Sequence, residues 1–149
     1  MKKLKFILFI VGLGSLIYLS SCKDDSDSTP SETDQQLITL QNNGTNWVLS
    51  SAGVSKDGFD VTSQFTGFKL NIGNKTYTTE NGLSPVWEPS GNWDFIDNNP
   101  SLILRDGDTQ ITVSVTSSAL TLTFTADAVP TGGRVESVSG EYQFHLASE

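Results

Sequence analysis

The chain has 149 residues and a formal net charge of -8, from 9 basic and 17 acidic residues. This acidic balance argues against a nucleic-acid partner, because phosphate binding requires clustered lysine and arginine side chains. A single Cys and a single His leave no material for an internal disulfide, a cysteine-rich metal site or a His-based zinc or nucleophile site. A chain of this length is expected to form one domain.

The N-terminal segment has the pattern of an export signal. Three lysines in the first five positions precede an uncharged apolar run, residues 6–19, which is too short to span a bilayer comfortably. The run ends in Leu19-Ser20-Ser21-Cys22, which resembles the lipobox of bacterial lipoproteins. That resemblance implies a signal peptide over residues 1–21, cleavage before Cys22, and acylation of Cys22 by fatty-acyl chains such as palmitate. The alternatives are an ordinary signal peptide with an incidental cysteine, or a signal anchor.

An acidic linker is predicted to follow the anchor, over residues 22–36. It holds no large apolar side chain, so it cannot bury enough surface to offset its ordering entropy, and we expect disorder. Several acyl chains on Cys22 would tether the protein permanently to the outer membrane. Lys23-Asp24-Asp25 resembles the export signal of surface lipoproteins in the Bacteroidota, which implies display at the cell surface. Without that signal, the protein would face the periplasm or the linker would carry no address.

The body, residues 37–149, reads as β-structure. Apolar side chains alternate with polar ones, as Leu120, Leu122 and Phe124 do with intervening threonines. Turn sequences such as Lys56-Asp57-Gly58 separate these segments. About eight strands are expected, at residues 46–52, 67–72, 75–79, 90–96, 101–105, 110–116, 119–126 and 140–147.

The order of these segments predicts an all-β fold, an antiparallel up-and-down meander that closes into a barrel or a flattened sandwich. Closure removes exposed strand edges, and we expect a monomer. A short extra strand is expected near Phe59-Asp60-Val61. Leu37 to Gln41 could instead form a short helix that covers one end of the barrel.

The body also resembles the lipocalin-like domains of small Bacteroidota lipoproteins. The residues that carry this resemblance are Gly44-Thr45-Asn46-Trp47, Asp60-Val61-Thr62, Phe65-Thr66-Gly67-Phe68, Tyr77-Thr78-Thr79, Ser90-Gly91-Asn92-Trp93-Asp94-Phe95, Leu120-Thr121-Leu122-Thr123-Phe124, Gly133-Arg134-Val135 and Ser139-Gly140-Glu141-Tyr142-Gln143-Phe144. The spacing departs from true lipocalins, which open with Gly-x-Trp, because two residues separate Gly44 from Trp47. The resemblance implies a lipocalin-like barrel over residues 37–149 that binds a small hydrophobic ligand.

The loop from Glu80 to Pro89 is the most informative candidate for binding. Trp87 lies between Pro85 and Pro89, and proline stiffens a loop that holds an aromatic ring. Trp87 could fold back as a lid over the core, or stack on a ligand at the rim beside Phe59 and Phe65. The predicted inward face, which we expect to fill most of the interior, comprises Trp47, Phe68, Leu70, Tyr77, Trp93, Phe95, Leu122, Phe124 and Phe144.

Two functions follow from these patterns. The first is binding of a small hydrophobic ligand in the interior, with Tyr77 and Trp93 as contacts. The alternative is a surface module whose rim loops contact glycan or a partner protein.

The remaining polar groups do not predict catalysis, a metal or a cofactor. His145 alternates with core residues and is expected to face solvent, and Asp106-Gly107-Asp108 fits a hairpin turn better than a calcium loop. Asp94 and Asp97 fit a solvated loop better than a general acid/base pair. Arg134 either pairs with an acid such as Asp94 or Glu136, or is solvated. We therefore expect a protein that binds and is not an enzyme.

Overall fold

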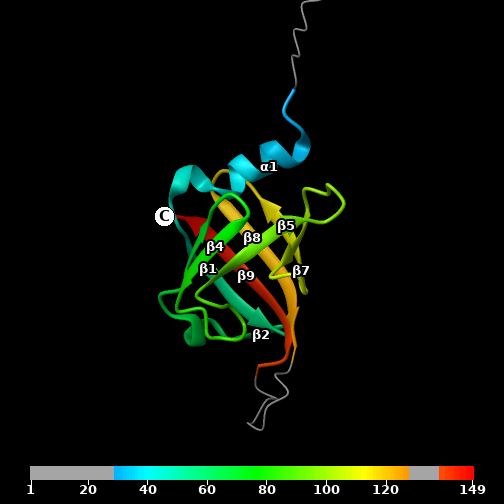
Figure 1. The fold of residues 1–149 in the computed structure, drawn as a ribbon. Helices are drawn as coiled ribbons and strands as arrows, with labels where there is room; N and C mark the ends of the chain where they lie inside the picture. Colours follow the sequence, from blue (N-terminus) through cyan, green and yellow to red (C-terminus); the bar gives the residue numbers. More distant parts are fainter. Residues whose placement is uncertain (1–28, 128–137) are drawn as a thin grey trace, which may run out of the picture.

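A computed structural model describes residues 29–127 and 138–149. In these residues nine antiparallel strands form one sheet, in the order β2-β1-β3-β4-β5-β6-β7-β8-β9, and β9 pairs back onto β1 (Figure 1). Eight of the strands therefore make a closed barrel, and β2 is the extra strand. The bounds are β1 Trp47–Lys56, β2 Phe59–Asp60, β3 Lys69–Ile72, β4 Thr76–Glu80, β5 Ser90–Phe95, β6 Leu102–Arg105, β7 Thr109–Val115, β8 Ala119–Ala126 and β9 Gly140–Ser148.

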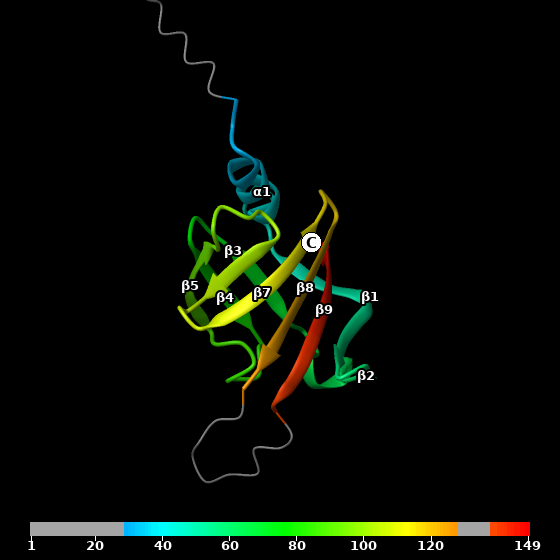
Figure 2. The ribbon, with the colours of Figure 1, turned by 90° about the vertical axis from the view of Figure 1, so that its right-hand side faces the viewer.

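The first and last strands close the barrel. Trp47 pairs with Ser148 and Lys56 pairs with Tyr142, so β1 follows β9 from end to end. The register shifts between Leu49 and Val54, which gives β1 a bulge where the strand bends. Figure 2 shows β7, β8 and β9 side by side on one wall, with β1 next to β9. The predicted antiparallel meander is confirmed, because from β3 to β9 each strand pairs with the next one along the chain.

The hairpin turns follow the chemistry of their sequences. Asp57 and Gly58 have φ of 50° and 81°, and Asp106 and Gly107 have φ of 53° and 86°. Two successive left-handed residues make the tight turns whose twist matches the twist of paired strands. The prediction that Asp106-Gly107-Asp108 is a hairpin turn is confirmed.

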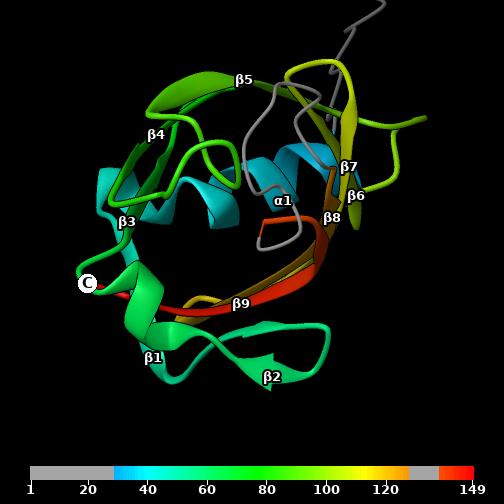
Figure 3. The ribbon, with the colours of Figure 1, turned by 90° about the horizontal axis from the view of Figure 1, so that it is seen from below.

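One helix, α1 (Glu32–Leu40), lies across one end of the barrel and leads through η1 (Asn42–Gly44) into β1 (Figures 1 and 3). Its last residue, Leu40, is buried, and the Trp47 indole N–H donates to the Leu40 carbonyl at 2.8 Å. The alternative of an end-covering helix is confirmed, but it begins five residues before Leu37, at Glu32. None of the helices in the described ranges is long and apolar enough to cross a lipid bilayer.

Disorder was the wrong prediction for residues 32–36. Ser31 accepts a hydrogen bond from the backbone N–H of Asp34, whose carboxylate in turn accepts from the backbone N–H of Ser31, and together they form a capping box. Glu32 and Asp34 also place negative charge at the positive end of the helix dipole. A capped N-terminus and the buried Leu40 give this polar segment enough contacts to order. The linker residues 22–28 lie outside the described residues.

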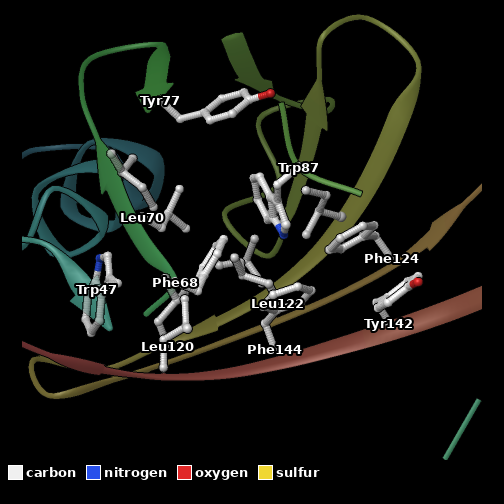
Figure 4. Packing of buried hydrophobic residues seen from close by; sticks show 14 of the residues in the cluster. Trp47, Phe68, Leu70, Tyr77, Trp87, Leu120, Leu122, Phe124, Tyr142 and Phe144 are labelled. Atoms are coloured by element: carbon white, nitrogen blue, oxygen red, sulfur yellow. The ribbon is translucent and has the colours of Figure 1, made fainter. Parts of the chain in front are cut away.

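The interior of the barrel is packed with aromatic and aliphatic side chains. The predicted inward residues are buried, except that Phe95 is only partly buried against the core. Phe144 is central, with ring-centre distances of 5.1 Å to Phe68 and 5.8 Å to Phe124 (Figure 4). Its ring centre also lies 4.9 Å from that of Phe65. The alternation along each strand therefore places one face of the sheet in a shared core.

Candidate functional site

The segment between β4 and β5, residues 81–89, folds into the end of the barrel opposite α1 (Figure 3). Val86 is fully buried and Trp87 is 3% exposed. Backbone hydrogen bonds from Val86 to Leu83 (2.9 Å) and from Trp87 to Gly82 (3.2 Å) hold the turn. The lid interpretation of Trp87 therefore describes this structure, in which the ring closes the barrel from within.

Trp87 lies in a box of aromatic rings (Figure 4). Its ring meets Tyr77 at 5.5 Å and 79°, Phe124 at 5.4 Å and 82°, and Phe144 at 6.0 Å and 85°. Phe68 adds a tilted contact at 6.0 Å. Edge-to-face contacts of this kind are the favoured geometry of aromatic pairs. The box is thus shaped for a flat aromatic group, and the chain fills it with its own indole.

A buried arginine adjoins the box. Arg105, the last residue of β6, is 6% exposed, and its guanidinium carbon lies 4.4 Å from the centre of the Trp87 ring and 4.8 Å from that of Phe124. Burial lowers the pKa of Arg105 from its ordinary value, because the charged form loses its hydration.

Two buried donors in this site lack hydrogen-bond partners. Within the described residues, neither Arg105 Nη1 nor Trp87 Nε1 is paired. An unsatisfied buried donor costs about 1–3 kcal/mol, and more where the group is charged. Buried polar groups in native proteins are nearly always paired, so two neighbouring exceptions make this end of the barrel the candidate site.

Asp106, the acidic residue next to Arg105, already accepts two hydrogen bonds. The Tyr77 hydroxyl donates to Asp106 Oδ2 at 2.6 Å, and the Asn92 backbone N–H donates to Oδ1 at 2.8 Å. Arg105 Nε lies 3.8 Å from Asp106 Oδ2, beyond hydrogen-bond range. Burial, followed by the hydrogen bond to Asp106, raises the pKa of the Tyr77 phenol above its ordinary value. Tyr77 is therefore a neutral donor at physiological pH, and Arg105 forms an ion pair with Asp106 that is too long to be a hydrogen bond.

The free space in the interior is small. A cavity of about 20 Å³ lies between Leu40 at the helix end, Arg105 on the wall and Trp87 at the other end. That volume holds about one water molecule, whereas ligand pockets usually measure ~300–1,000 Å³. The expectation of a nearly filled interior is confirmed. A larger molecule does not fit into the interior in this conformation.

The buried position of the Trp87 ring is favoured by some free-energy contributions and opposed by others. Burying an indole of about 200 Å² favours it by about 5 kcal/mol. The unpaired Nε1–H opposes it by about 1–3 kcal/mol. Asn81 and Leu83, both with φ of 55°, add backbone strain of at least about 1 kcal/mol each. These costs only partly offset the burial of the ring, its aromatic contacts and its cation–π contact with Arg105, all of which hold it inside the barrel.

The structure brings together most of the sequence-predicted candidates. Trp87, Tyr77 and Trp93 contribute to the lining of the interior cavity. Phe65 is fully buried in the core beside Phe144, whereas Phe59, on β2, is 76% exposed. The rim cluster of Trp87 with Phe59 and Phe65 is therefore not present in this conformation. Cys22 and Arg134 lie outside the described residues.

Arg105 is the functional candidate that the sequence pattern did not reveal. Its signal is positional: Ile103 faces the interior, and Arg105 is two residues farther along the same strand. A charge at an inward position of a barrel strand is rare enough to mark a functional candidate. Leu102 and Leu104 flank these positions and blur the alternation, which is why the pattern did not stand out.

The other polar candidates lie on the surface. Asp94 forms an exposed ion pair with Lys75, and Asp97 is a turn residue with φ of 51°. His145 contacts Thr121 and Gln143 on the outer face of the sheet. Over residues 29–127 and 138–149, no group of three or more His, Cys, Asp or Glu side chains could hold a metal ion.

Comparisons of this chain with protein-family models, curated proteins and solved structures gave no match. The assignment of a small antiparallel eight-stranded barrel, which is consistent with a lipocalin-like fold, therefore depends on the strand pairing alone.

Proposed function

We propose that this protein is a non-catalytic binder of a small hydrophobic ligand, which occupies the barrel in place of the Trp87 ring. The observation that carries the proposal is the buried indole itself: a ring on a strained loop, in an aromatic box, with an unpaired N–H. A ligand of similar shape would keep the aromatic contacts and release the indole to water. The alternative rim site would depend on Phe59, because Phe65 and Trp87 are buried.

Trp87→Ala is expected to bind indole at least tenfold more tightly than the wild-type chain, because the competing side chain is gone. Isothermal titration of both proteins with indole measures the two affinities, and near-ultraviolet circular dichroism checks that the variant is folded. Phe59→Ala is the matched control, since it removes an exposed aromatic side chain from another part of the molecule. Its affinity for indole should equal that of the wild type.

Two results would contradict this function. If the wild-type chain shows no binding at the solubility limit of indole, the barrel does not exchange its plug for a ligand. If Phe59→Ala abolishes binding while Trp87→Ala leaves it unchanged, the ligand binds at the surface and the alternative function replaces this one.

We propose further that Cys22 is acylated and anchors the protein to the outer membrane, as in a lipocalin-like lipoprotein of the Bacteroidota. The support is the sequence pattern around Leu19-Ser20-Ser21-Cys22. Cys22→Ala is expected to leave an uncleaved precursor or to release the protein from membrane fractions. Membrane fractionation with mass measurement tests this. A variant that remains membrane-bound at the mature mass would exclude anchoring through Cys22.

A further inference from the structure

The buried guanidinium of Arg105 has features that its position in the core does not require. It lies against the faces of two aromatic rings, and Nη1 has no partner in the described part of the chain. A methionine or leucine at this inward position would fill similar space without placing a charge in the core. The retained charge therefore points to an acceptor that is supplied from outside the chain.

The neighbouring acids do not supply that acceptor. The oxygens of Asp106 accept from Tyr77 and Asn92, and Arg105 Nε remains 3.8 Å from Oδ2. Asp108 and Glu88 act on Arg105 only through longer-range attraction. These three carboxylates limit the negative charge that the site tolerates, so a ligand with a single charge fits better than one with two.

The position of Trp87 specifies the rest of the ligand. The indole contacts the guanidinium and the rings of Tyr77, Phe124 and Phe144, and the guanidinium also lies over the Phe124 ring at 4.8 Å. A flat apolar body that replaced the indole would lie under the same guanidinium and adjoin the small cavity that reaches toward Leu40. Because the guanidinium lies 4.4 Å over the centre of the present ring, it would have to turn toward the ring edge to meet a carboxylate carried there.

We propose that the ligand is a flat aromatic monocarboxylate, whose ring takes the place of the Trp87 indole and whose carboxylate accepts hydrogen bonds from the Arg105 guanidinium. This inference depends on the proposed ligand-binding function and narrows it to one chemical class. The guanidinium offers a planar set of donors that matches a carboxylate. Binding would thus satisfy Arg105 Nη1 and return the Trp87 N–H to water.

The test compares two probes of the same shape on the full chain in a non-ionic detergent. Naphthalene-2-carboxylate carries the charge, and naphthalene-2-carboxamide does not. Isothermal titration at neutral pH is expected to show the carboxylate binding the wild type at least tenfold more tightly than the amide. In Arg105→Met this ratio should fall to about one, through loss of carboxylate affinity with amide affinity retained.

Two further variants serve as a control and as a conservative substitution in the comparison of carboxylate with amide. Lys69→Met removes an exposed cation that pairs with Glu149 at 2.6 Å, and should leave the tenfold ratio unchanged. Arg105→Lys keeps the charge without the planar donors, and should give an intermediate ratio even if Arg105→Met does not fold.

The outcomes separate the two proposals. Equal affinities of wild type for both probes, or a preference that persists in Arg105→Met, would overturn the carboxylate inference while the binding function stands. An Arg105→Lys ratio equal to that of wild type would also overturn the role given to the planar guanidinium. If neither probe nor indole binds the wild type, the binding function itself fails.

Discussion

Phe144→Ala is expected to lower the free energy of unfolding by about 3–5 kcal/mol, the usual range for removing a buried phenylalanine. Phe144 is fully buried on β9, the strand that closes the barrel against β1. Its ring contacts three elements at once, with Phe65 from η2 (Thr62–Phe65), Phe124 from β8 and Trp87 from the inward loop. Because β1 and β8 are paired with β9 on its two sides, the backbone around the ring is held in place and the cavity that the ring leaves cannot collapse easily.

His145→Ala is the matched control for this prediction. The residue is the next one on the same strand and lies on the outer face, where its ring contacts Thr121 and Gln143. Its removal should change the free energy of unfolding by no more than about 0.5 kcal/mol. Urea unfolding of both variants, followed by circular dichroism, provides the comparison. Equal effects of the two substitutions would mean that β9 does not divide into a core face and a solvent face.

Gly91→Ala is expected to lower the free energy of unfolding by about 3 kcal/mol or more. A β-carbon at this position would overlap Asp106 Oδ1 and would lie 2.6 Å from both Cε1 and the hydroxyl oxygen of Tyr77. Overpacking alone costs about 1–3 kcal/mol. Separating Tyr77 from Asp106 adds the loss of a hydrogen bond to a charged acceptor, about 1.5–3 kcal/mol. The Tyr77 ring thus lies over a position in β5 where only a hydrogen fits.

Gly107→Ala distinguishes packing from backbone strain. Gly107 has φ of 86°, and no atom lies within 4 Å of the place that a β-carbon would take, so its substitution should cost only the strain, about 1–2 kcal/mol.

In a Gly91→Ala, Tyr77→Phe pair, the combined loss of unfolding free energy should be smaller than the sum of the single losses, because both changes remove the same hydrogen bond. Additive losses in urea unfolding would show that Gly91 and the Tyr77–Asp106 pair are independent.

The site combines features that weaken a core with features that a ligand would use. An arginine with an unpaired nitrogen, an indole without an acceptor and two left-handed loop residues lie within one end of the barrel. The α1 end also has two left-handed residues, Asn42 and Asn43, but the buried side chain of Asn42 there is hydrogen-bonded to Asn46 and Ser148. Natural proteins break the usual rules of packing and hydrogen bonding mainly where function requires it. The two unpaired buried donors are the reason that the proposed ligand site is placed at the Trp87 end and not at the α1 end.

The candidate site was only partly predictable. Trp87, Tyr77 and Trp93 stood out as large aromatic residues on a proline-flanked loop and on alternating strands. Whether Trp87 points inward or outward depends on contacts with Tyr77, Phe124 and Phe144, which lie on three different strands. Arg105 resembles any surface arginine until the strand that carries it is placed in the barrel. The helix start was missed for a different reason: Ser31 and Asp34 form a local cap inside a segment that composition alone marks as disordered.

The amino-acid sequence by itself determined an antiparallel meander, as a barrel or a flattened sandwich, because the two-residue alternation and the turn residues act locally and recur along the whole body. The pairing of β9 with β1, between residues far apart in the chain, made it a closed barrel. The sequence also determined that the interior would be rich in aromatic side chains. Only the tertiary structure decided that the Trp87 ring fills the end of the barrel and that the Arg105 guanidinium lies against it. Those choices depend on free energies of burial and pairing between residues far apart in the chain, and no local pattern records them.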